Sequence, residues 1–256
     1  MISLNWLPET AYLFLLVFAR VGSVLMLMPA LGEGTIPARM RLTFALGLTL
    51  VLYPIVTPVL PPLPEGVFAV VALVIHEVVI GLILGAIGRL SVTGTQVAGS
   101  IIASTSGLSV ATAADPVNGG AQGALIGAFL SLLGVALIFA TDLHHVAISA
   151  IMDSYMVFSA RDPLLFGDAA STIVEVVAGA FVIGVQMSAP FIVFGLVFNL
   201  GMGILSRLMP QLQVFFIAMP ATVGVGLVLM ALLLSMMMGL YLMHFEGVLA
   251  VLRGVA

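Results

Sequence analysis

Seventy consecutive residues, from Val176 to Phe245, contain one charged side chain, that of Arg207: VVAGAFVIGVQMSAPFIVFGLVFNLGMGILSRLMPQLQVFFIAMPATVGVGLVLMALLLSMMMGLYLMHF. The uncharged runs before and after Arg207 are 31 and 38 residues long. Because about 20 predominantly apolar residues cross the hydrocarbon core of a bilayer as a helix, each run is long enough to span a membrane. The stretch therefore predicts an all-α, polytopic membrane protein.

The composition of the whole chain agrees with this prediction. Of its 256 residues, 62% are hydrophobic and 7% are charged, and lysine is absent. The absence of cysteine excludes disulfides and thiolate metal sites. A net charge of −4 gives no basic surface, so nucleic acid is not expected as a partner. The first 19 residues lack Lys and Arg, so we expect the N-terminus to stay as a helix rather than to be a signal peptide.

Prolines and glycines divide the chain into about six hydrophobic helical segments. We expect these segments at about 8–28, 38–56, 65–106, 121–139, 168–206 and 221–245. The third segment is too long for one simple span and changes character near Arg89. The stretch 141–168 is more polar and joins the fourth segment to the fifth.

Local signals refine these helices. Asp168 is expected to cap the fifth helix, and Pro190 to kink it. Pro210 and Pro220 are expected to bracket a short segment before the last helix. In the third helix, Gly81 and Gly85 have the small-xxx-small spacing that lets another helix approach closely.

Four charged residues lie within or beside the apolar segments. They are Arg20, Glu77, Arg89 and Arg207. An unpaired charge at the centre of a membrane helix costs about 2.5 to 3.5 kcal/mol on insertion scales, so each should have a partner or a water-filled cavity. For each one, a structural salt bridge or an interfacial arginine is favoured over a transport role.

Two polar features interrupt the apolar pattern. Thr93, Gln96, Ser100 and Ser104 follow one another at steps of three, four and four, which places them on one face of a helix. Residues 107–120, GLSVATAADPVNGG, keep neither a helical nor a strand period. Irregular backbone at membrane depth is tolerated only where protein buries it or water reaches it. The segment therefore lines a cavity or path, or is an ordinary exposed connector, and the residues alone leave both open.

Patterns of catalysis and metal binding are missing from the sequence. It contains no G-x-S-x-G elbow, no H-E-x-x-H pair, no P-loop and no G-x-G-x-x-G after a strand. Asp142, His144 and His145 could suggest a metal, but adjacent histidines are expected to point to different helix faces, and the next acid, Asp153, is distant in sequence. We interpret them as a loop end at an aqueous boundary, and expect no catalytic residue, metal site or cofactor.

Several short segments, spread over nearly the whole chain, match the pattern of one known family. They are Phe18-Ala19-Arg20, Pro29-Ala30-Leu31-Gly32, Ile36-Pro37-Ala38-Arg39, Gly107-Leu108-Ser109 with Asp115-Pro116, and Arg207 to Phe215 with Pro220. Together they make the sequence resemble the FliR family, the export-gate membrane proteins of flagellar type III secretion, which also occur in virulence injectisomes. The segment from Arg207 to Phe215 is the most distinctive of these resemblances.

The resemblance implies one export-gate membrane domain over 1–256, in which helical regions 1–106 and 121–256 flank a central loop, 107–120. It implies long bent helical hairpins in a FliP/FliQ-like helical assembly, located in the bacterial inner membrane at the flagellar basal body. FliP and FliQ subunits would join this chain to form the pore for unfolded flagellar export substrates, the export switch protein FlhB would dock around it, and membrane lipid would surround it. The role would not be enzymatic.

The resemblance also implies roles for individual residues. The loop would plug the closed pore, through Gly107, Leu108, Ser109, Val110, Ala113, Asp115, Pro116, Gly119 and Gly120. The stripe of Thr93, Gln96, Ser100 and Ser104 would face the pore. Candidates for subunit junctions are Arg20, Arg207, Pro210 and Gln211. The chain departs from the family in having Val110 and Ala113 where bulky aromatic residues are common.

The alternative is a small-solute or ion transporter, because broken helices and polar stripes at mid-membrane suit one. However, the sequence shows no evident inverted repeat, and the loop lacks the charged rings of an ion filter. An intramembrane enzyme would need a converging acid, base or nucleophile set, which the sequence does not offer.

Overall fold

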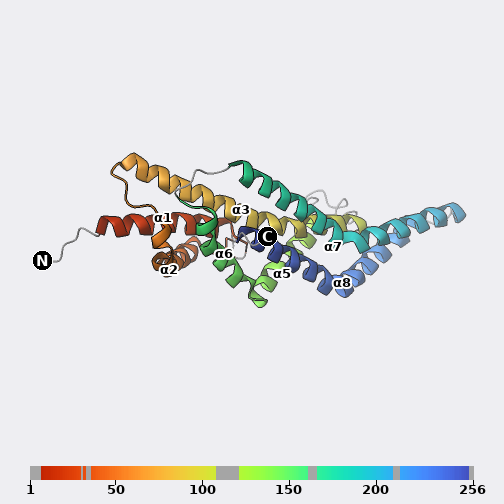
Figure 1. Ribbon diagram of the computed structural model, residues 1–256. Helices are drawn as coiled ribbons and strands as arrows, with labels where there is room; N and C mark the ends of the chain where they lie inside the picture. Colours follow the sequence, from red (N-terminus) through yellow and green to blue (C-terminus); the bar gives the residue numbers. More distant parts are fainter. Residues whose placement is uncertain are drawn as a thin grey trace. The chain divides into compact units, whose positions relative to one another are not determined.

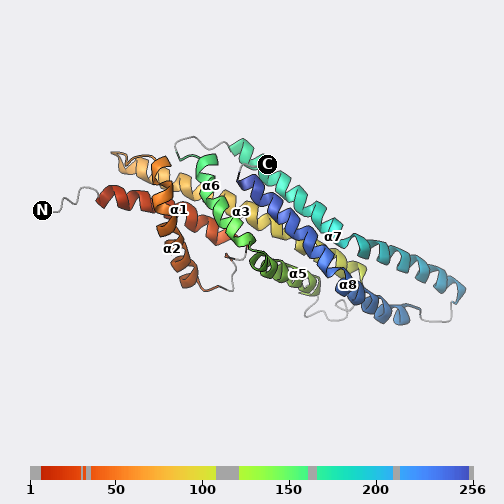
Figure 2. The same ribbon diagram turned by 60° about the horizontal axis from the view of Figure 1, so that its bottom comes forward.

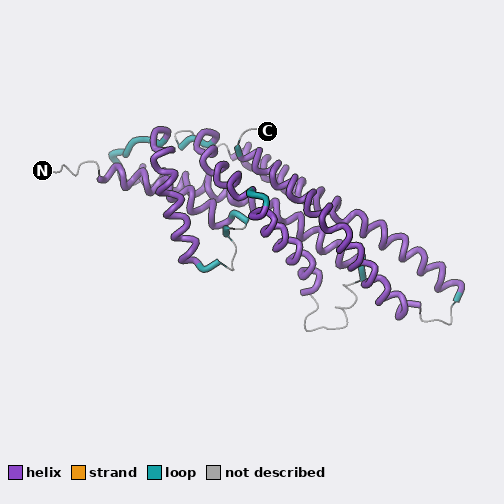
Figure 3. Tube along the Cα trace, turned by 90° about the horizontal axis from the view of Figure 1, so that it is seen from below, coloured by secondary structure: helices purple, strands orange, loops and turns teal. Residues whose placement is uncertain are grey.

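The computed structural model describes residues 7–29, 31–32, 36–107, 121–160, 166–209 and 214–253. Its helices are α1 (Leu7–Leu27), α2 (Ala38–Val56), the short 3-10 helix η2 (Thr57–Val59), α3 (Val67–Thr105), α5 (Ala121–Ala140), α6 (Leu143–Val157), α7 (Phe166–Leu208) and α8 (Val214–Leu252) (Figure 1). Within the described ranges no strand occurs, as the colouring of Figure 3 shows. The prediction of an all-α protein is confirmed.

Five of the described helices are long and apolar enough to cross a membrane, namely α1, α2, α3, α7 and α8. The pair α5 and α6, bent by 79° at its junction, would make a sixth span if it is counted as one. Large apolar side chains of these helices lie exposed, such as Leu232 at 74% and Met243 at 71%. Because exposure of so much apolar surface to water is unfavourable, these side chains belong in lipid or against other membrane helices. The chain is a membrane protein.

The described chain divides into two compact units. Unit 1 comprises residues 1–91, 138–176 and 245–256, and unit 2 comprises 92–137 and 177–244. The long helices α3, α5, α7 and α8 therefore each contribute residues to both units. The change of unit in α3, between Ser91 and Val92, falls close to Arg89, where the sequence changes character.

Unit 1 is built around α1, whose Leu16, Val17 and Val21 are completely buried. The two glycines of α3 lie directly against this helix. A methyl group on Gly81 would lie 2.6 Å from the carbonyl oxygen of Arg20, and one on Gly85 would lie 2.8 Å from Cβ of Leu27. Only glycine permits this approach, so the prediction from the small-xxx-small spacing is confirmed.

Unit 2 contains most of α7 and α8, over residues 177–208 and 214–244, which form an antiparallel hairpin and lie side by side in both ribbon views (Figures 1 and 2). Elsewhere in the unit, α3 and α5 meet through small residues. A methyl group on Gly99 would collide with the backbone of Gly127. One turn away on α3, the hydroxyl groups of Thr95 and Ser131 are 2.7 Å apart and share a hydrogen bond. Close backbone approach and hydroxyl pairing of this kind stabilise membrane helix pairs in place of a hydrophobic force.

One helix was not predicted, and two expectations about helix boundaries are wrong. The stretch 141–168 contains a helix of its own, α6. Asp168 does not precede the fifth helix, because α7 already begins at Phe166. Pro220 lies inside α8, which starts at Val214 and continues to Leu252. The proline removes one backbone hydrogen bond, to the carbonyl of residue 216, and the rest of this apolar helix is long enough to tolerate that loss.

Candidate functional sites

The most densely bonded polar group of unit 1 is the guanidinium of Arg20. Its Nε donates to Oε2 of Glu77 at 2.6 Å, and its Nη2 donates to Oε1 of the same carboxylate at 2.9 Å. Nη1 donates to the backbone oxygen of Ser154 at 3.0 Å, and Nη2 also donates to that of Phe158 at 2.8 Å. Both charged side chains are completely buried. The site thus joins α1, α3 and the end of α6.

This arrangement satisfies an arginine that would otherwise be costly in a membrane. The carboxylate of Glu77 receives the two-pronged bond that a planar guanidinium is shaped to make. Ser154 and Phe158 belong to the last turn and C-cap of α6, where unpaired carbonyls carry partial negative charge. The ring of Tyr155 lies 4.0 Å from the guanidinium carbon and adds a cation–π contact.

The cluster confirms the structural salt bridge expected for Arg20. With a hydroxyl contact to Ser154 Oγ at 3.4 Å, the donors of the guanidinium are all directed to groups of this chain. The side chain is 0% exposed. These contacts hold three helices of unit 1 together, and a junction role for Arg20 stays a prediction.

Arg207 has the opposite setting. It lies in the last turn of α7, with an exposed side chain, and no described residue pairs with it. Its neighbours Leu205 and Leu208 are 40% and 72% exposed. Pro210 and Gln211, the other junction candidates, lie outside the described residues.

The stripe on α3 lies on the outer side of that helix in unit 2. Gln96, Ser100 and Ser104 are exposed and Thr93 is half-buried. The hydroxyl groups of Ser100 and Ser104 donate to backbone carbonyls of their own helix, each at 2.8 Å. Ala98, on the opposite side, is completely buried. The expected single polar face is present, and its orientation toward a pore stays a prediction.

A cavity of about 490 Å³ begins where the stripe ends. Hydroxyl and amide groups from three helices line it, at Ser104 and Thr105 of α3, Asn199 and Ser206 of α7, and Thr222 of α8. Gly107 also lines the cavity and has a left-handed backbone, with φ of 72°. It thus ends α3 in the way a glycine after a helix commonly does.

The remaining loop positions proposed for the plug lie outside the described residues. They are Leu108, Ser109, Val110, Ala113, Asp115, Pro116, Gly119 and Gly120.

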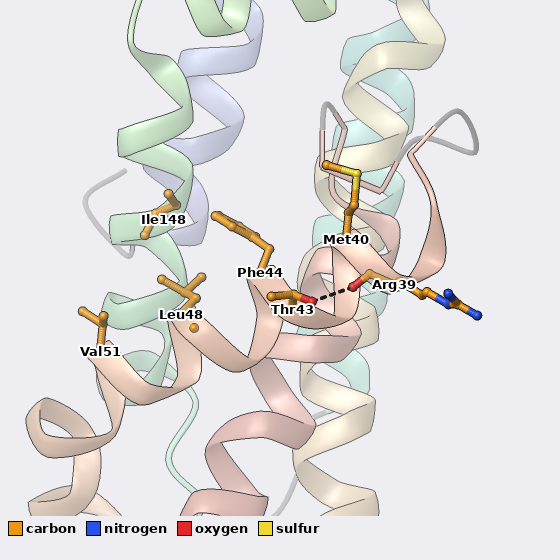
Figure 4. Close-up of a pocket in the computed structure, with 8 residues that line it drawn as sticks. Arg39, Met40, Thr43, Phe44, Leu48, Val51 and Ile148 are labelled. Carbon is orange, nitrogen blue, oxygen red and sulfur yellow. Dashed lines mark hydrogen bonds between the residues drawn. The ribbon is translucent and has the colours of Figure 1, made fainter.

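A larger groove of about 770 Å³ runs along α2 in unit 1. Figure 4 shows Phe44, Leu48 and Val51 of α2 turned toward Ile148 of α6, while the side chain of Arg39 extends away from them. The groove is apolar along its length and offers no group that could carry out chemistry.

The expectation that His144 and His145 point to different helix faces is wrong. The rings of His144 and His145 have centroids 4.1 Å apart, and Nδ1 of His145 lies 3.6 Å from Oδ1 of Asp142. One donor atom of each of the three residues lies within 4.8 Å of the others. Asp142 and His145 are exposed at the turn between α5 and α6. Groups of this kind at an exposed turn are common without a bound ion, so the geometry does not assign a metal.

The comparisons with known proteins agree with one another. The family model of the bacterial export proteins, family 1, matches residues 11–248. Flagellar biosynthetic protein FliR of Caulobacter vibrioides is 46% identical over 224 residues, which are 88% of this chain and 89% of that protein. FliR of Bacillus subtilis is 31% identical, with 87% and 86% covered, and FliR of Escherichia coli is 28% identical, with 91% and 87% covered. Since both the family model and these relatives extend over most of its length, the chain belongs to the FliR family of bacterial export proteins.

Proposed function

We propose that this chain is a non-enzymatic core subunit of the flagellar type III export gate, and that with FliP and FliQ it forms the pore through which unfolded flagellar subunits leave the cell. The sequence identity of 46% to a flagellar biosynthetic protein over most of both chains carries the proposal. The membrane-embedded, all-α architecture supports it. The site of action is the inner membrane at the flagellar basal body, with FlhB docked around the assembly.

The exported chain passes the polar face of α3. The exposed groups there are the amide of Gln96 and the hydroxyls of Ser100 and Ser104, and none of them is charged. Both hydroxyls already donate to carbonyl groups of their own helix. They make the surface hydrophilic without offering free hydrogen-bond donors. Such a surface suits a path for varied side chains, because strong binding of any one of them would stall a passing polypeptide.

The central loop, 107–120, is the plug of the resting pore. Its described first residue, Gly107, stands at the mouth of the polar cavity at the end of α3. Small and permissive residues in the rest of the loop suit a segment that must move aside during export.

Arg207, with Pro210 and Gln211, is the junction to a neighbouring subunit. Its guanidinium is exposed at the end of an apolar helix, and no described residue pairs with it. Because arginine keeps its charge and offers five fixed donors, a carboxylate or carbonyl group of a partner subunit is the complement it requires.

Deletion of the gene tests the proposal. Loss of filament assembly and of secreted flagellar substrates, with normal growth and small-solute uptake, is the expected result, and a plasmid copy should restore both. A motile deletion strain with a specific uptake defect would instead establish the transporter. Purification gives an independent answer: a gate subunit should be recovered in a stable complex with two smaller membrane proteins, a transporter alone or as a homo-oligomer.

A further inference from the structure

We propose that unit 1 holds a specific site for an anionic phospholipid, with the lipid phosphate at Arg41 and an acyl chain in a cavity walled by α1, α2 and α3. The cavity has a volume of about 380 Å³, within the usual range for small-ligand sites. Its apolar wall includes Phe18, Gly22, Met26, Leu42, Ala45 and Leu82. Met26, Leu42 and Leu82 are 63%, 52% and 41% exposed, so the cavity is open to surrounding lipid.

The first observation that points to an anion is an unpaired donor. Arg41 lines the cavity, and its Nε is buried without a hydrogen-bond partner among the residues that the structure describes. A buried donor on a charged group is costly to leave unsatisfied, more so than a neutral one. In the same unit, every donor of Arg20 is matched, whereas the buried Nε of Arg41 has no partner among the described residues and could bind an added anion.

The second observation is the charge around Arg41. It lies in the first turn of α2, which also carries Arg39 and contains no acidic residue. The helix is preceded by Pro37, which provides no side-chain cap for the free backbone N–H groups. The guanidinium of Arg41 and the positive end of the helix dipole thus act together, although cations are disfavoured at that end. An anion is the group that would relieve this arrangement.

The position of the charge in the membrane identifies the anion as a lipid headgroup. α2 and η2 make up the candidate span Ala38–Val59, and Arg41 lies near its beginning, where headgroups would be. From there the apolar wall follows α1 from Met26 back to Phe18, about 12 Å at 1.5 Å per residue. A free phosphate would satisfy Arg41 but leave this wall uncovered. A phospholipid carries its phosphate and its acyl chain in the order that the cavity requires.

The groove on the other face of α2 provides the contrast. It is larger, at about 770 Å³, but Arg39 extends away from it in Figure 4. Thr43, also in its wall, has its hydroxyl bonded to the backbone oxygen of Arg39 at 2.9 Å. The charged group of Arg39 is directed away from the apolar wall, so lipid in that groove should exchange freely with the bilayer. The chain therefore offers a matched control for each variant of the proposed site.

The test measures lipids that remain with the full chain, purified with its complex, after transfer into nanodiscs of equal parts phosphatidylglycerol and phosphatidylcholine. Mass spectrometry of the extracted lipid gives the enrichment of the anionic species. Arg41→Gln should lower this enrichment roughly tenfold, because a hydrogen bond between two charged groups is lost. Arg39→Gln should leave it within about twofold, as expected for an exposed interfacial charge.

A second pair of variants fills the two cavities. A methyl group added at Gly22 would lie 3.9 Å from the ring of Phe18, an ordinary contact, so Gly22→Leu is the variant designed to fill the cavity that Gly22 lines. A methyl group added at Gly47 would meet nothing within 4 Å, so Gly47→Leu is the matching variant for the groove of Figure 4. Only Gly22→Leu should reduce the phosphatidylglycerol enrichment.

A test on the unaltered protein does not depend on whether the variants fold. It measures the thermal unfolding midpoint with different lipids added. Phosphatidylglycerol should raise the midpoint more than phosphatidylcholine, and inorganic phosphate should have no effect. Unchanged enrichment in Arg41→Gln, or an equal loss in Arg39→Gln, would overturn the site. Stabilisation by inorganic phosphate would show a free-anion site instead. A crosslink from Leu42 to a partner helix in the intact complex would show that protein, not lipid, covers the cavity.

Discussion

Glu77 of α3 holds Arg20 of α1 through two hydrogen bonds, of 2.6 and 2.9 Å, in a place from which solvent is fully excluded. The ion pair in turn positions the end of α6, since the same guanidinium binds the carbonyl oxygens of Ser154 and Phe158. Removing either charge leaves the other buried without its counter-charge. Substitution of either residue should therefore destabilise unit 1.

Arg20→Ala should destabilise the protein by about 3 to 5 kcal/mol, the typical cost of leaving one half of a buried pair. Glu77→Ala should have a similar effect. The double variant Arg20→Met with Glu77→Leu should lose less than the sum of the two, because no isolated charge remains. The thermal unfolding midpoint in detergent measures these effects. Additive losses in the double variant would show that the two residues act separately.

The surface pair of Arg253 and Asp153 is the control for this experiment. Nε of Arg253 lies 2.8 Å from Oδ2 of Asp153, and the side chains are 40% and 31% exposed. An exposed pair contributes about 0 to 1 kcal/mol. Arg253→Ala should thus leave the midpoint nearly unchanged.

Gly81→Ala should weaken the packing of α1 against α3. The added methyl group would lie 2.6 Å from a backbone oxygen that cannot move without displacing α1. Overpacking of this kind costs about 1 to 3 kcal/mol. Gly47→Ala, at a position with nothing within 4 Å, should be neutral or slightly stabilising, since alanine favours helix. Equal unfolding midpoints for the two variants would contradict the close approach.

Cysteines introduced on α3 test the path. The chain has no cysteine, so each variant carries a single thiol. In the assembled complex, a water-soluble maleimide should label Gln96→Cys, Ser100→Cys and Ser104→Cys readily and Thr93→Cys more slowly, because its position is half-buried. Ala98→Cys and Ala103→Cys, at buried positions, should resist labelling. Labelling of the stripe only after disruption of the complex would mean that it packs against a partner.

Arg207→Ala should separate assembly from folding. The side chain is exposed and pairs with no described residue. The free energy of unfolding of the isolated chain should therefore change by no more than about 0.5 kcal/mol. Recovery of the complex with its partner subunits should nevertheless fall, and more than for Arg253→Ala. Equal recovery of both variants would remove Arg207 from the junction.

The apolar helices were predictable because the length of an uncharged run is enough to indicate a membrane-spanning helix. The uncharged runs around Arg207 correspond to α7 and α8, and the spacing of Gly81 and Gly85 correctly indicated the approach of α1. The helix α6 was missed because small and polar residues make up much of its buried face, with Ile151 and Tyr155 as its large side chains. Ala147, Ala150, Ile151, Ser154 and Tyr155 form that face, and their spacing of three and four was the available signal.

The site of Arg20 was predictable only in part. A buried arginine needs an acid, and Glu77 was one of the few candidates. Its other acceptors, however, are backbone oxygens of Ser154 and Phe158, which lie 134 and 138 positions away and carry no side-chain signal. The convergence of Asp142 with His145 was missed for a related reason, because side-chain directions at a helix start depend on a turn that the sequence did not reveal.

Gly107 allows a test of the loop that separates backbone strain from bulk. Its φ of 72° favours glycine, and asparagine tolerates this region better than other residues do. A Cβ at this position would meet Thr222 at 3.5 Å, an ordinary contact, so space alone does not forbid a small side chain.

Gly107→Asn should therefore keep most of the secretion of flagellar substrates. Gly107→Val should reduce it strongly, because a β-branched residue is strained at positive φ by about 1 to 2 kcal/mol or more and would shift the start of the loop. Secreted substrate in the culture medium, with the amount of complex in the membrane as control, measures both variants. Equal secretion by the two would show that the conformation at the end of α3 does not matter for export.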